Sequence, residues 1–242
     1  MEAIKTINLT KKYKDLIAVD DVNLQIEQGE LFALLGVNGA GKSTMVKMLS
    51  CLTRPTGGDA FVGGHSILRE EAKVKAMTGV SPQETAVAEN LSVKENLELI
   101  CGIYGYSTEQ TDARIKALSS QFHLQDVLGK RACKLSGGWK RKVSICMALI
   151  SQPKILFLDE PTLGLDVIAR SELWDNIRTL KGKTTIILTT HYMEEAQALS
   201  DRIGIMGDGK LLVVGTPQEL MDLTGEDRFE NAFIRIVKEA AK

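Results

Sequence analysis

A glycine-rich segment at residues 36–44, GVNGAGKST, has the residue types and spacing of a phosphate-binding loop. It matches the pattern G-x-x-x-x-G-K-[ST] through Gly36, Gly41, Lys42 and Ser43. In such a loop backbone N–H groups converge on phosphate oxygens, the lysine reaches the β- and γ-phosphates, and the hydroxyl binds Mg²⁺. The alternative is a plain glycine-rich turn with an exposed lysine. The predicted nucleotide contacts within the segment are Gly36, Asn38, Gly39, Ala40, Gly41, Lys42, Ser43 and Thr44.

Two adjacent carboxylates, Asp159 and Glu160, end the apolar run ILFLDE and could complete a hydrolytic site. Hydrolysis beside such a loop needs a carboxylate for the metal ion and a group that orients the attacking water. We expect Asp159 to hold Mg²⁺ and Glu160 to act as general base or water orienter. His191 ends the later run TTIILTTH, and its ring could hydrogen-bond the γ-phosphate or the water. A solvated turn and a solvent-facing histidine are the alternatives.

A second glycine pair opens the segment LSGGWKRKVS at residues 135–144. Ser136 is a good N-cap candidate, and Gly137 and Gly138 present N–H groups without side chains in the way. The segment therefore predicts a second helix N-terminus suited to an anion. Three cations follow at residues 140–142, and we expect them to lie near a bound triphosphate or to extend into solvent.

The elements that must position these groups include continuous apolar runs at residues 31–36, 155–160 and 184–191. Runs of this kind are typical of central strands that are covered on both faces. Helical patterns at 43–52 and 167–180 separate them, so the sequence predicts an α/β fold with a mainly parallel sheet. Such sheets bind ligands at the carboxyl ends of their strands, which is where the two carboxylates lie.

Residues 84–152 differ from this predicted core because they contain no convincing strand. Ser92 with Glu95, and Ser107 with Gln110, instead match the capping box that opens helices. We therefore expect a helical subdomain inserted between strands of the sheet.

The chain as a whole is predicted to form one nucleotide-binding domain with a short tail. Alternation in VNLQIE predicts a half-buried antiparallel strand, and so an N-terminal antiparallel β subdomain beside the P-loop NTPase core. An amphipathic helical pattern closes the chain. The predicted boundaries are 1–225 for the domain, with its core at 1–83 and 153–225 and its helical subdomain at 84–152, and 226–242 for the tail.

The composition is that of an ordinary soluble globular protein, with 44% hydrophobic and 25% charged residues. Thirty Lys and Arg residues balance 31 Asp and Glu residues, which argues against a broad nucleic-acid-binding surface. The four cysteines lie far apart and predict buried thiols instead of disulfides or zinc ligands. The sequence contains no signal peptide and no run of about 20 apolar residues, so we expect a cytosolic chain.

The order of these motifs resembles that of the ATP-binding subunits of ABC transporters. GVNGAGKST, LSGG, ILFLDEPT, GLD and TTH follow one another, and the resemblance extends from KKYKDLIAVDDVNLQIEQGE to GKLLVVGTPQEL. It implies that the nucleotide is ATP and that Tyr13 stacks on its adenine. It also implies that Gln83 touches Mg²⁺ and the attacking water, and that Asp166 communicates across a dimer.

The resemblance further implies a dimer with two shared ATP sites. Ser136, Gly137 and Gly138 of each subunit would contact the γ-phosphate held by the other, so that ATP joins the subunits and hydrolysis releases them. Two copies of this chain or two related subunits would form the dimer.

Family members commonly have glutamine where this chain has Trp139. The spacing from Trp139 to Val143 favours packing on the helix, with a contact to the nucleotide or across the dimer as the alternative.

A separate integral membrane permease is the other partner that the resemblance implies. This chain would then lie on the cytoplasmic face of the cell membrane, with the neighbourhood of SVKENL at residues 92–97 forming part of the docking surface. We expect export, because no regulatory domain of the sugar-importer kind follows the core.

One alternative function is that of an ABC ATPase outside transport, such as a subunit of a cofactor-assembly scaffold. Another is a nucleotide-gated binding module that no longer hydrolyses.

Overall fold

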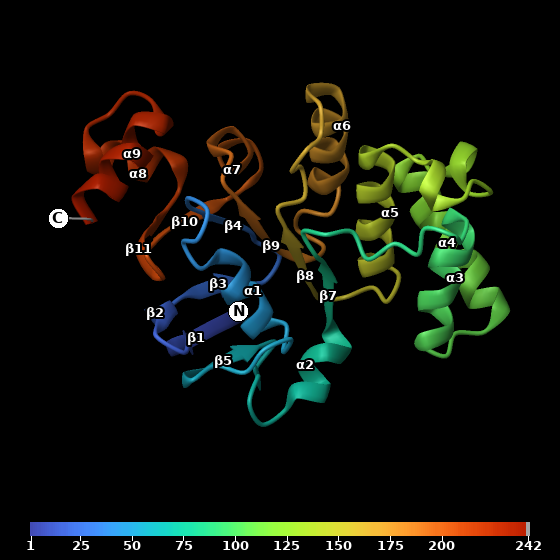
Figure 1. Ribbon diagram of the computed structural model, residues 1–242, viewed down its shortest axis with the longest axis horizontal. Helices are drawn as coiled ribbons and strands as arrows, with labels where there is room; N and C mark the ends of the chain where they lie inside the picture. Colours follow the sequence, from blue (N-terminus) through green and yellow to red (C-terminus); the bar gives the residue numbers. More distant parts are fainter. Residues whose placement is uncertain (241–242) are drawn as a thin grey trace.

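Two β-sheets and the helices that pack on them form the fold in the computed structural model, which describes residues 1–240 (Figure 1). The larger sheet contains β4 (Leu31–Leu35), β7 (Thr78–Ser81), β8 (Ile155–Asp159), β9 (Thr185–Thr190), β10 (Arg202–Gly207) and β11 (Lys210–Gly215). Their order across the sheet is β11-β10-β4-β9-β8-β7. β10, β4, β9, β8 and β7 run parallel, whereas β11 pairs antiparallel with β10 at one edge. The predicted mainly parallel sheet is confirmed.

The central strands are buried on both faces, as their continuous apolar runs predict. Every residue of β4, β8 and β9 is buried. On one face Phe157 and Ile187 belong to an apolar cluster with helix α1 (Lys42–Leu49). On the other face Leu156 and Leu188 cluster with residues of α5 (Gly137–Leu149) and α6 (Val167–Arg178). The phosphate-binding loop, Glu160 and His191 therefore follow adjacent strands at one edge of the sheet.

The second sheet is antiparallel and is built from the N-terminal strands. These are β1 (Glu2–Tyr13), β2 (Leu16–Val22), β3 (Gln25–Glu27), β5 (Gly57–Val62) and β6 (His65–Ser66). Val22, Leu24 and Ile26 are all buried, as their alternation predicts. They do not share one strand, because β2 ends at Val22 and β3 begins at Gln25, each pairing with a different part of β1.

Helices α1 and α6 follow the predicted patterns but end early. α1 stops at Leu49 and not at residue 52, since Cys51 adopts a left-handed backbone with φ 57°. α6 stops at Arg178 and not at residue 180, although Leu180 stays buried. The remaining helices outside residues 84–152 are α2 (Glu71–Met77), α7 (Met193–Leu199), α8 (Pro217–Thr224) and α9 (Phe229–Ala240).

Residues 84–152 lie between β7 and β8 and form a group of helices that we call the helical block. It contains α3 (Val93–Ile103), α4 (Thr108–Phe122), α5 and 3-10 turns at Gln125–Val127 and Ala132–Lys134. Both predicted capping boxes are present, at Ser92 and Ser107. Figure 1 shows the block beside the sheet, beyond α6, with α5 nearest to the strands. α5 packs on β7 and so joins the block to the sheet.

The predicted amphipathic tail forms α9, and its apolar stripe is confirmed. Phe229, Phe233 and Ile236 are buried in a cluster that includes Leu35 of β4 and Ile203 of β10. Residues 241–242, which the tail prediction also covered, lie outside the described residues.

The four cysteines differ in exposure, which corrects the expectation of four buried thiols. Cys101 and Cys146 are buried, Cys51 is half-buried and Cys133 is exposed. Cys133 lies in a 3-10 turn whose inward position is taken by Ala132, so its own side chain points outward.

Candidate nucleotide-binding and hydrolysis site

The phosphate-binding loop connects the buried strand β4 to helix α1 at the carboxyl edge of the larger sheet. Gly41 adopts φ 99°, and a Cβ at this position would overlap the carbonyl oxygen of Ala18. Glycine is therefore required at this turn. The first N–H groups of α1 have no partners within the helix, so the turn leaves them available to an anion in front of the loop.

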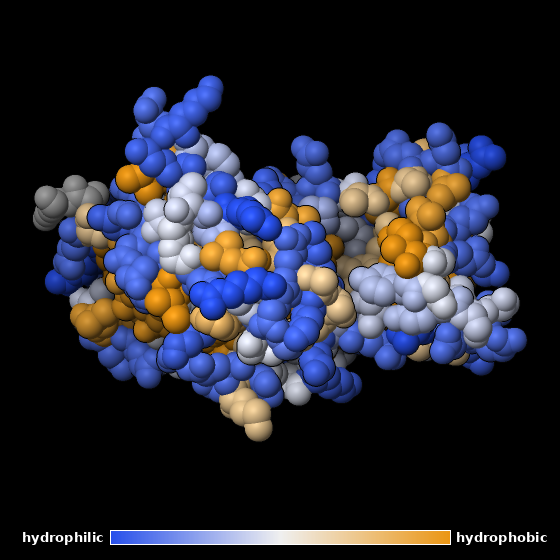
Figure 2. Space-filling view, turned by 90° about the horizontal axis from the view of Figure 1, so that it is seen from below, coloured by the Kyte–Doolittle hydropathy of each residue, from blue (hydrophilic) through white to orange (hydrophobic). Residues whose placement is uncertain are grey.

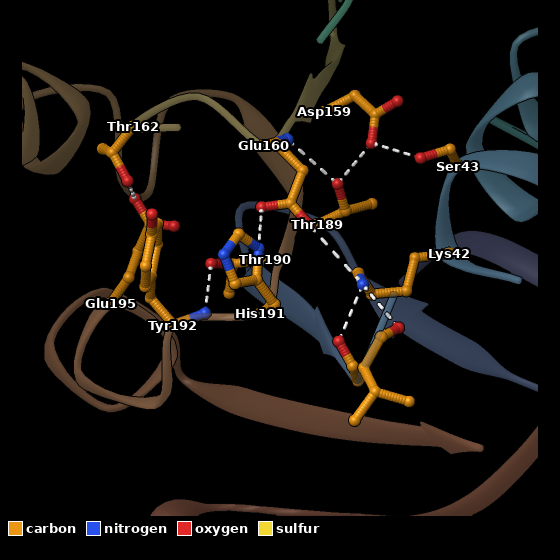
Figure 3. Close-up of polar contacts among 12 residues, drawn as sticks. Lys42, Ser43, Asp159, Glu160, Thr162, Thr189, Thr190, His191, Tyr192 and Glu195 are labelled. Carbon is orange, nitrogen blue, oxygen red and sulfur yellow. Dashed lines mark hydrogen bonds and ion pairs between the residues drawn. The ribbon is translucent and has the colours of Figure 1, made fainter. Parts of the chain in front are cut away.

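Lys42 is held inside the loop and is 6% exposed. Its Nζ donates to the carbonyl oxygens of Gly36 at 2.7 Å and Val37 at 3.2 Å. The same atom lies 3.5 Å from Oε1 of Glu160 (Figure 3). A buried ammonium needs such partners to keep its charge. Lys42 thus links the loop to the carboxylate that follows β8.

Asp159 and Ser43 meet as the metal-site prediction requires. Ser43 Oγ donates to Asp159 Oδ1 at 2.9 Å, and Thr189 Oγ1 donates to the same oxygen at 2.5 Å. Thr189 also accepts a hydrogen bond from the N–H of Glu160 at 3.0 Å, so one hydroxyl positions both carboxylate residues (Figure 3). Sequence reasoning missed Thr189. The sequence shows only a threonine near the end of the apolar run 184–191, and the pairing of that run with the strand carrying Asp159 comes from the structure.

Glu160 lies between a cation and an imidazole. It is 5% exposed, and its Oε2 is 2.8 Å from Nδ1 of His191 (Figure 3). Its backbone has φ 49°, a left-handed conformation that costs a non-glycine residue about 1–2 kcal/mol. Hydrogen bonds from its N–H to the carbonyl and hydroxyl oxygens of Thr189 stabilise this conformation. These hydrogen bonds hold the backbone, while Lys42 and His191 hold the carboxylate.

A cavity of about 670 Å³ lies in front of these groups. Its size suits a small ligand. Its lining brings together the predicted loop residues from Asn38 to Thr44 with Tyr13, Gln83, Glu160 and His191. Tyr13 is exposed to this space, and the Lys11 ammonium lies 4.9 Å from the centre of its ring. Further lining residues that sequence reasoning did not single out are Leu16, Ile17, Ala18, Leu163, Asp208 and Gly209.

A buried carboxylate, Glu195, stabilises the turn behind this site. Its Oε1 accepts hydrogen bonds from Thr162 Oγ1 at 2.8 Å and Trp174 Nε1 at 3.0 Å. Burial raises the pKa of Glu195 above its ordinary value, and the hydrogen bonds oppose that rise. The residue ties α7, which follows His191, to the turn that follows Glu160 and to α6.

The glycine end of α5 lies outside the cavity. Ser136 occupies the N-cap position, yet within residues 1–240 its hydroxyl caps no helix N–H. Ser136 and Gly137 are exposed, and a Cβ added at Gly137 would meet nothing within 4 Å in the described chain. Gly138 faces α6, where a Cβ would lie 3.3 Å from that of Ala169. The end of α5 therefore points outward with its N–H groups accessible.

The three cations of α5 do not extend into solvent, which corrects that expectation, and their position relative to a bound triphosphate stays a prediction. Lys140 pairs with Glu89 at 2.6 Å, and Lys142 pairs with Glu172 at 2.7 Å. Arg141 donates to backbone carbonyl oxygens in the loop that contains Gln83. Packing of α5 against α3 and α4, α6 and the sheet leaves these side chains little access to solvent. They serve contacts within the chain.

Trp139 and Asp166 have local contacts. Trp139 is half-buried and packs on the apolar cluster that contains Val143, as its spacing predicts. Asp166 caps α6, because its Oδ1 accepts hydrogen bonds from the N–H groups of Ile168 and Ala169. Its contact across a dimer stays a prediction.

A family model described as ABC transporter matches residues 19–163 of the chain. The daunorubicin resistance ATP-binding protein DrrA3 of Streptomyces coeruleorubidus is 40% identical over 229 residues, which cover 94% of this chain and 72% of that protein. The chain belongs to the ABC transporter family. The probable multidrug ABC transporter ATP-binding protein YbhF of Escherichia coli is 38% identical over 240 residues, covering 97% of this chain and 41% of that protein. The chain thus spans less than half the length of this second ABC relative.

Solved structures of ABC ATPases have the same fold. The structure described as the ATP-binding subunit of an ABC transporter aligns with a TM-score of 0.86 and 27% identity, covering 97% of this chain and 99% of that chain. A dimeric post-hydrolysis state of the ATP-binding cassette MJ0796, bound to ADP and Pi, aligns with a TM-score of 0.80 and 28% identity over 88% of this chain and 98% of that chain. The predicted P-loop NTPase fold is confirmed. The chain is an ATP-binding ABC ATPase.

Proposed function

We propose that this ABC ATPase hydrolyses MgATP in a dimer and thereby drives a separate membrane permease in the direction of export. The observation that carries the proposal is the position of Glu160. Its buried carboxylate lies between Lys42 and His191 and lines the same cavity as the phosphate-binding loop. A general base must lie within hydrogen-bond reach of the water that it activates. In this cavity that water would lie between Glu160 and the terminal phosphate.

The reaction assigned to this site is attack of water on the γ-phosphorus. The bond to the β–γ bridging oxygen breaks, the water proton passes to Glu160, and ADP and phosphate leave. Lys42 would exchange its contacts with Gly36, Val37 and Glu160 for the β- and γ-phosphates, which frees the carboxylate of Glu160 to accept the proton. His191 holds that carboxylate through Nδ1 and stabilises the charge that develops on the phosphate.

The oxygen donors at this site suit magnesium. Asp159 supplies a carboxylate that forms no ion pair with any residue in 1–240, Ser43 supplies a hydroxyl, and Gln83 supplies an amide oxygen. Mg²⁺ prefers such hard oxygen ligands and neutralises charge on the β- and γ-phosphate oxygens. We assign Ser43, Gln83 and Asp159 as the residues that would hold it, and Tyr13 as the residue that stacks on adenine.

The exposed end of α5 supports a dimer in which two chains share each ATP. Ser136, Gly137 and Gly138 would bind the γ-phosphate of an ATP molecule held by the loop of the other subunit. Val167 and Ile168 are largely exposed at the start of α6, beside Gly138, and would extend the contact around Asp166. The related cassette MJ0796 was solved as a dimer. The partner proposed here is a second copy or a related subunit.

A groove between the sheet and the helical block fits a permease segment. It has a volume of about 400 Å³ and is lined mostly by apolar side chains. Leu52 and Ile103 line it and are 62% and 71% exposed, and Figure 2 shows hydrophobic side chains gathered on the helical block. Apolar patches rimmed by polar residues are typical of protein contacts. We propose this groove as part of the docking surface. The C-terminal half of α3 lines it through Ile100 and Ile103, and residues 92–97 at the start of the same helix stay part of the proposed surface.

The permease is proposed as a separate chain at the cytoplasmic face of the membrane. None of the helices within residues 1–240 is long and apolar enough to cross a bilayer. The names of the relatives refer to daunorubicin resistance and multidrug transport, which favours an amphipathic compound as the exported substrate. Solubilised membranes should therefore yield an integral membrane protein bound to this chain. A partner that is not a membrane protein would favour a cofactor-assembly scaffold.

Substituting Glu160→Gln tests the proposed chemistry. Turnover of ATP should fall by about 10²–10³-fold, because the amide cannot accept the proton, while MgATP binding persists. Glu194→Gln, an exposed neighbour of the site, is the control and should keep turnover within about twofold. Wild-type turnover in Glu160→Gln would refute the assignment of the base.

A further inference from the structure

Arg141 is a buried cation that the proposed chemistry does not use. It lies in the second turn of α5 and is 5% exposed. Its two terminal nitrogens donate to successive carbonyl oxygens, that of Pro82 at 2.6 Å and that of Gln83 at 2.5 Å. Burial lowers the pKa of its guanidinium, and Asp159 and Glu195 oppose this change. An arginine remains charged at neutral pH, so both hydrogen bonds are charge-assisted.

We propose that Arg141 is a positioning residue that fixes Gln83 from α5 and so couples the outward glycine end of this helix to the hydrolysis cavity. The inference rests on the proposed function, because it assigns a role to Gln83 and to the end of α5 within that function.

The segment around Gln83 has few other supports. Gln83, Glu84 and Ala86 are exposed, and the next buried side chain along the chain is that of Val87. Within residues 1–240, the carbonyl oxygens of Pro82 and Gln83 receive their hydrogen bonds from Arg141. A loop without such contacts samples many conformations. The guanidinium therefore determines where Gln83 enters the cavity.

The geometry of an arginine suits this task better than that of a lysine. Its planar fork binds two acceptors in a fixed relative orientation, whereas an ammonium acts as a point charge. A second contact joins the same elements, because Ser81 at the end of β7 and Ser144 of α5 lie 2.9 Å apart through their hydroxyl oxygens. The two contacts together make α5 and the loop after β7 move as a unit.

The connection to the end of α5 is short. Arg141 follows Gly137 by four residues, which is about 6 Å along the helix axis. A phosphate that binds at Gly137 from the other subunit shifts or tilts the first turn of α5, and the guanidinium carries this displacement to Gln83. ATP bound in one subunit thus reaches the hydrolysis cavity of its partner by a single helical turn and two hydrogen bonds.

A double-mutant cycle tests this inference. Arg141→Met keeps the length and packing of the stem but removes the donors, and it should lower kcat by about 10–30-fold with KM for ATP changed less than about threefold. Arg141→Lys should recover part of this loss. If Arg141 acts through Gln83, then Arg141→Met in a Gln83→Ala background should add less than about a twofold further loss. Lys140→Met, which removes a neighbouring cation that pairs with Glu89, is the control and should leave kcat unchanged.

Three outcomes would overturn the inference. They are an unchanged kcat in Arg141→Met, an equal loss with and without the Gln83 side chain, and a wild-type kcat in Gln83→Ala. If Arg141→Met does not fold, as judged by circular dichroism, the same cycle with Arg141→Lys decides by the same criterion. Glu160→Gln separates this failure from failure of the proposed function, because hydrolysis must be lost there whether or not Arg141 positions Gln83.

Discussion

The two glycine-bearing helix ends of this chain, at α1 and α5, differ in how far the chain itself completes them. At α1 the turn is packed so closely that Gly41 has no room for a Cβ, and Lys42 is buried among carbonyl oxygens and a carboxylate. At α5 Gly137 is open to solvent, and the N-cap hydroxyl of Ser136 makes no capping contact within residues 1–240. The glycine-bearing N-terminus of a helix is thus packed against the chain at α1 and exposed to solvent at α5.

The charges around the two ends differ in the same sense. Lys42 at α1 points into the site and offsets Glu160. At α5 the three cations are directed to Glu89, Glu172 and the loop after β7, away from the glycine N–H groups. The difference supports the proposed shared site, in which α1 would hold its phosphate alone and α5 would offer only N–H groups to a phosphate held by the other subunit.

Of the substitutions that test this difference between the two helix ends, Ser136→Arg should have the largest effect on ATP turnover. An arginine at the exposed end of α5 would fill the space of the incoming phosphate, so turnover should fall by about 100-fold or more. ATP binding to the single subunit should not change, because Ser136 lies outside the cavity. Equilibrium nucleotide binding and steady-state turnover measure the two effects.

A matched control for Ser136→Arg is Ser107→Arg, which replaces the N-cap serine of α4. That serine does cap its helix, so stability should fall by about 1 kcal/mol while turnover is kept. Full turnover in Ser136→Arg would show that the end of α5 binds no phosphate.

Alanine substitutions of Gly41 and Gly137 should change the free energy of unfolding in opposite directions. Gly41→Ala forces a Cβ into a carbonyl oxygen at positive φ, and the free energy of unfolding should fall by about 2–4 kcal/mol. Gly137→Ala meets open space in a helix, and the free energy of unfolding should rise by up to about 1 kcal/mol. Urea unfolding measures both, and equal destabilisation would contradict the contrast between a closed and an open helix end.

The dimer should protect one thiol and leave another unchanged. Cys133 is exposed three residues before Ser136, so ATP should slow its alkylation in Glu160→Gln by about tenfold. Burial, with Glu71 adding to it, raises the pKa of Cys51, beyond α1, to about 11. Its thiol therefore stays protonated at neutral pH, and its alkylation should be slow, should rise with pH towards about 11 and should not respond to ATP. Mass spectrometry of labelled peptides measures each site, and ATP-dependent protection of Cys51 alone would contradict this assignment.

Trp139→Gln should have the smallest effect. The side chain packs on the apolar face of α5 and is not needed for the N–H groups of Gly137 and Gly138, so turnover should remain within about threefold of wild type. Stability should fall slightly as the contact with the cluster is lost. A turnover loss above about tenfold would show that Trp139 contacts the nucleotide or the partner subunit.

Motif spacing and strand pattern predict which residues lie together at the centre of the candidate site. The glycine loop, Asp159 and His191 each follow a continuous apolar run, and the carboxyl ends of parallel strands meet at one edge whatever the detailed packing. The same reasoning predicts both capping boxes of the helical block, because a capping box is a local interaction.

The contacts that sequence reasoning missed depend on packing between distant segments. Thr189 reaches Asp159 because β8 and β9 are adjacent in register, and Arg141 reaches Pro82 because α5 lies against β7. No local pattern encodes either neighbour. For the same reason the sequence does not predict the ion pairs of Lys140 and Lys142, since their partners Glu89 and Glu172 come from other segments of the chain.

The most direct test of the shared site mixes two defective chains. Lys42→Ala damages the loop at α1, Ser136→Arg damages the end of α5, and both chains also carry Glu160→Gln so that ATP is retained. Each chain alone should stay monomeric in ATP by light scattering. The mixture should form a dimer with one bound ATP, because one intact loop then faces one intact α5 end across the interface. A mixture that stays monomeric, while the chain carrying Glu160→Gln alone dimerises, would contradict the account, because both halves of the site would then have to lie on one chain.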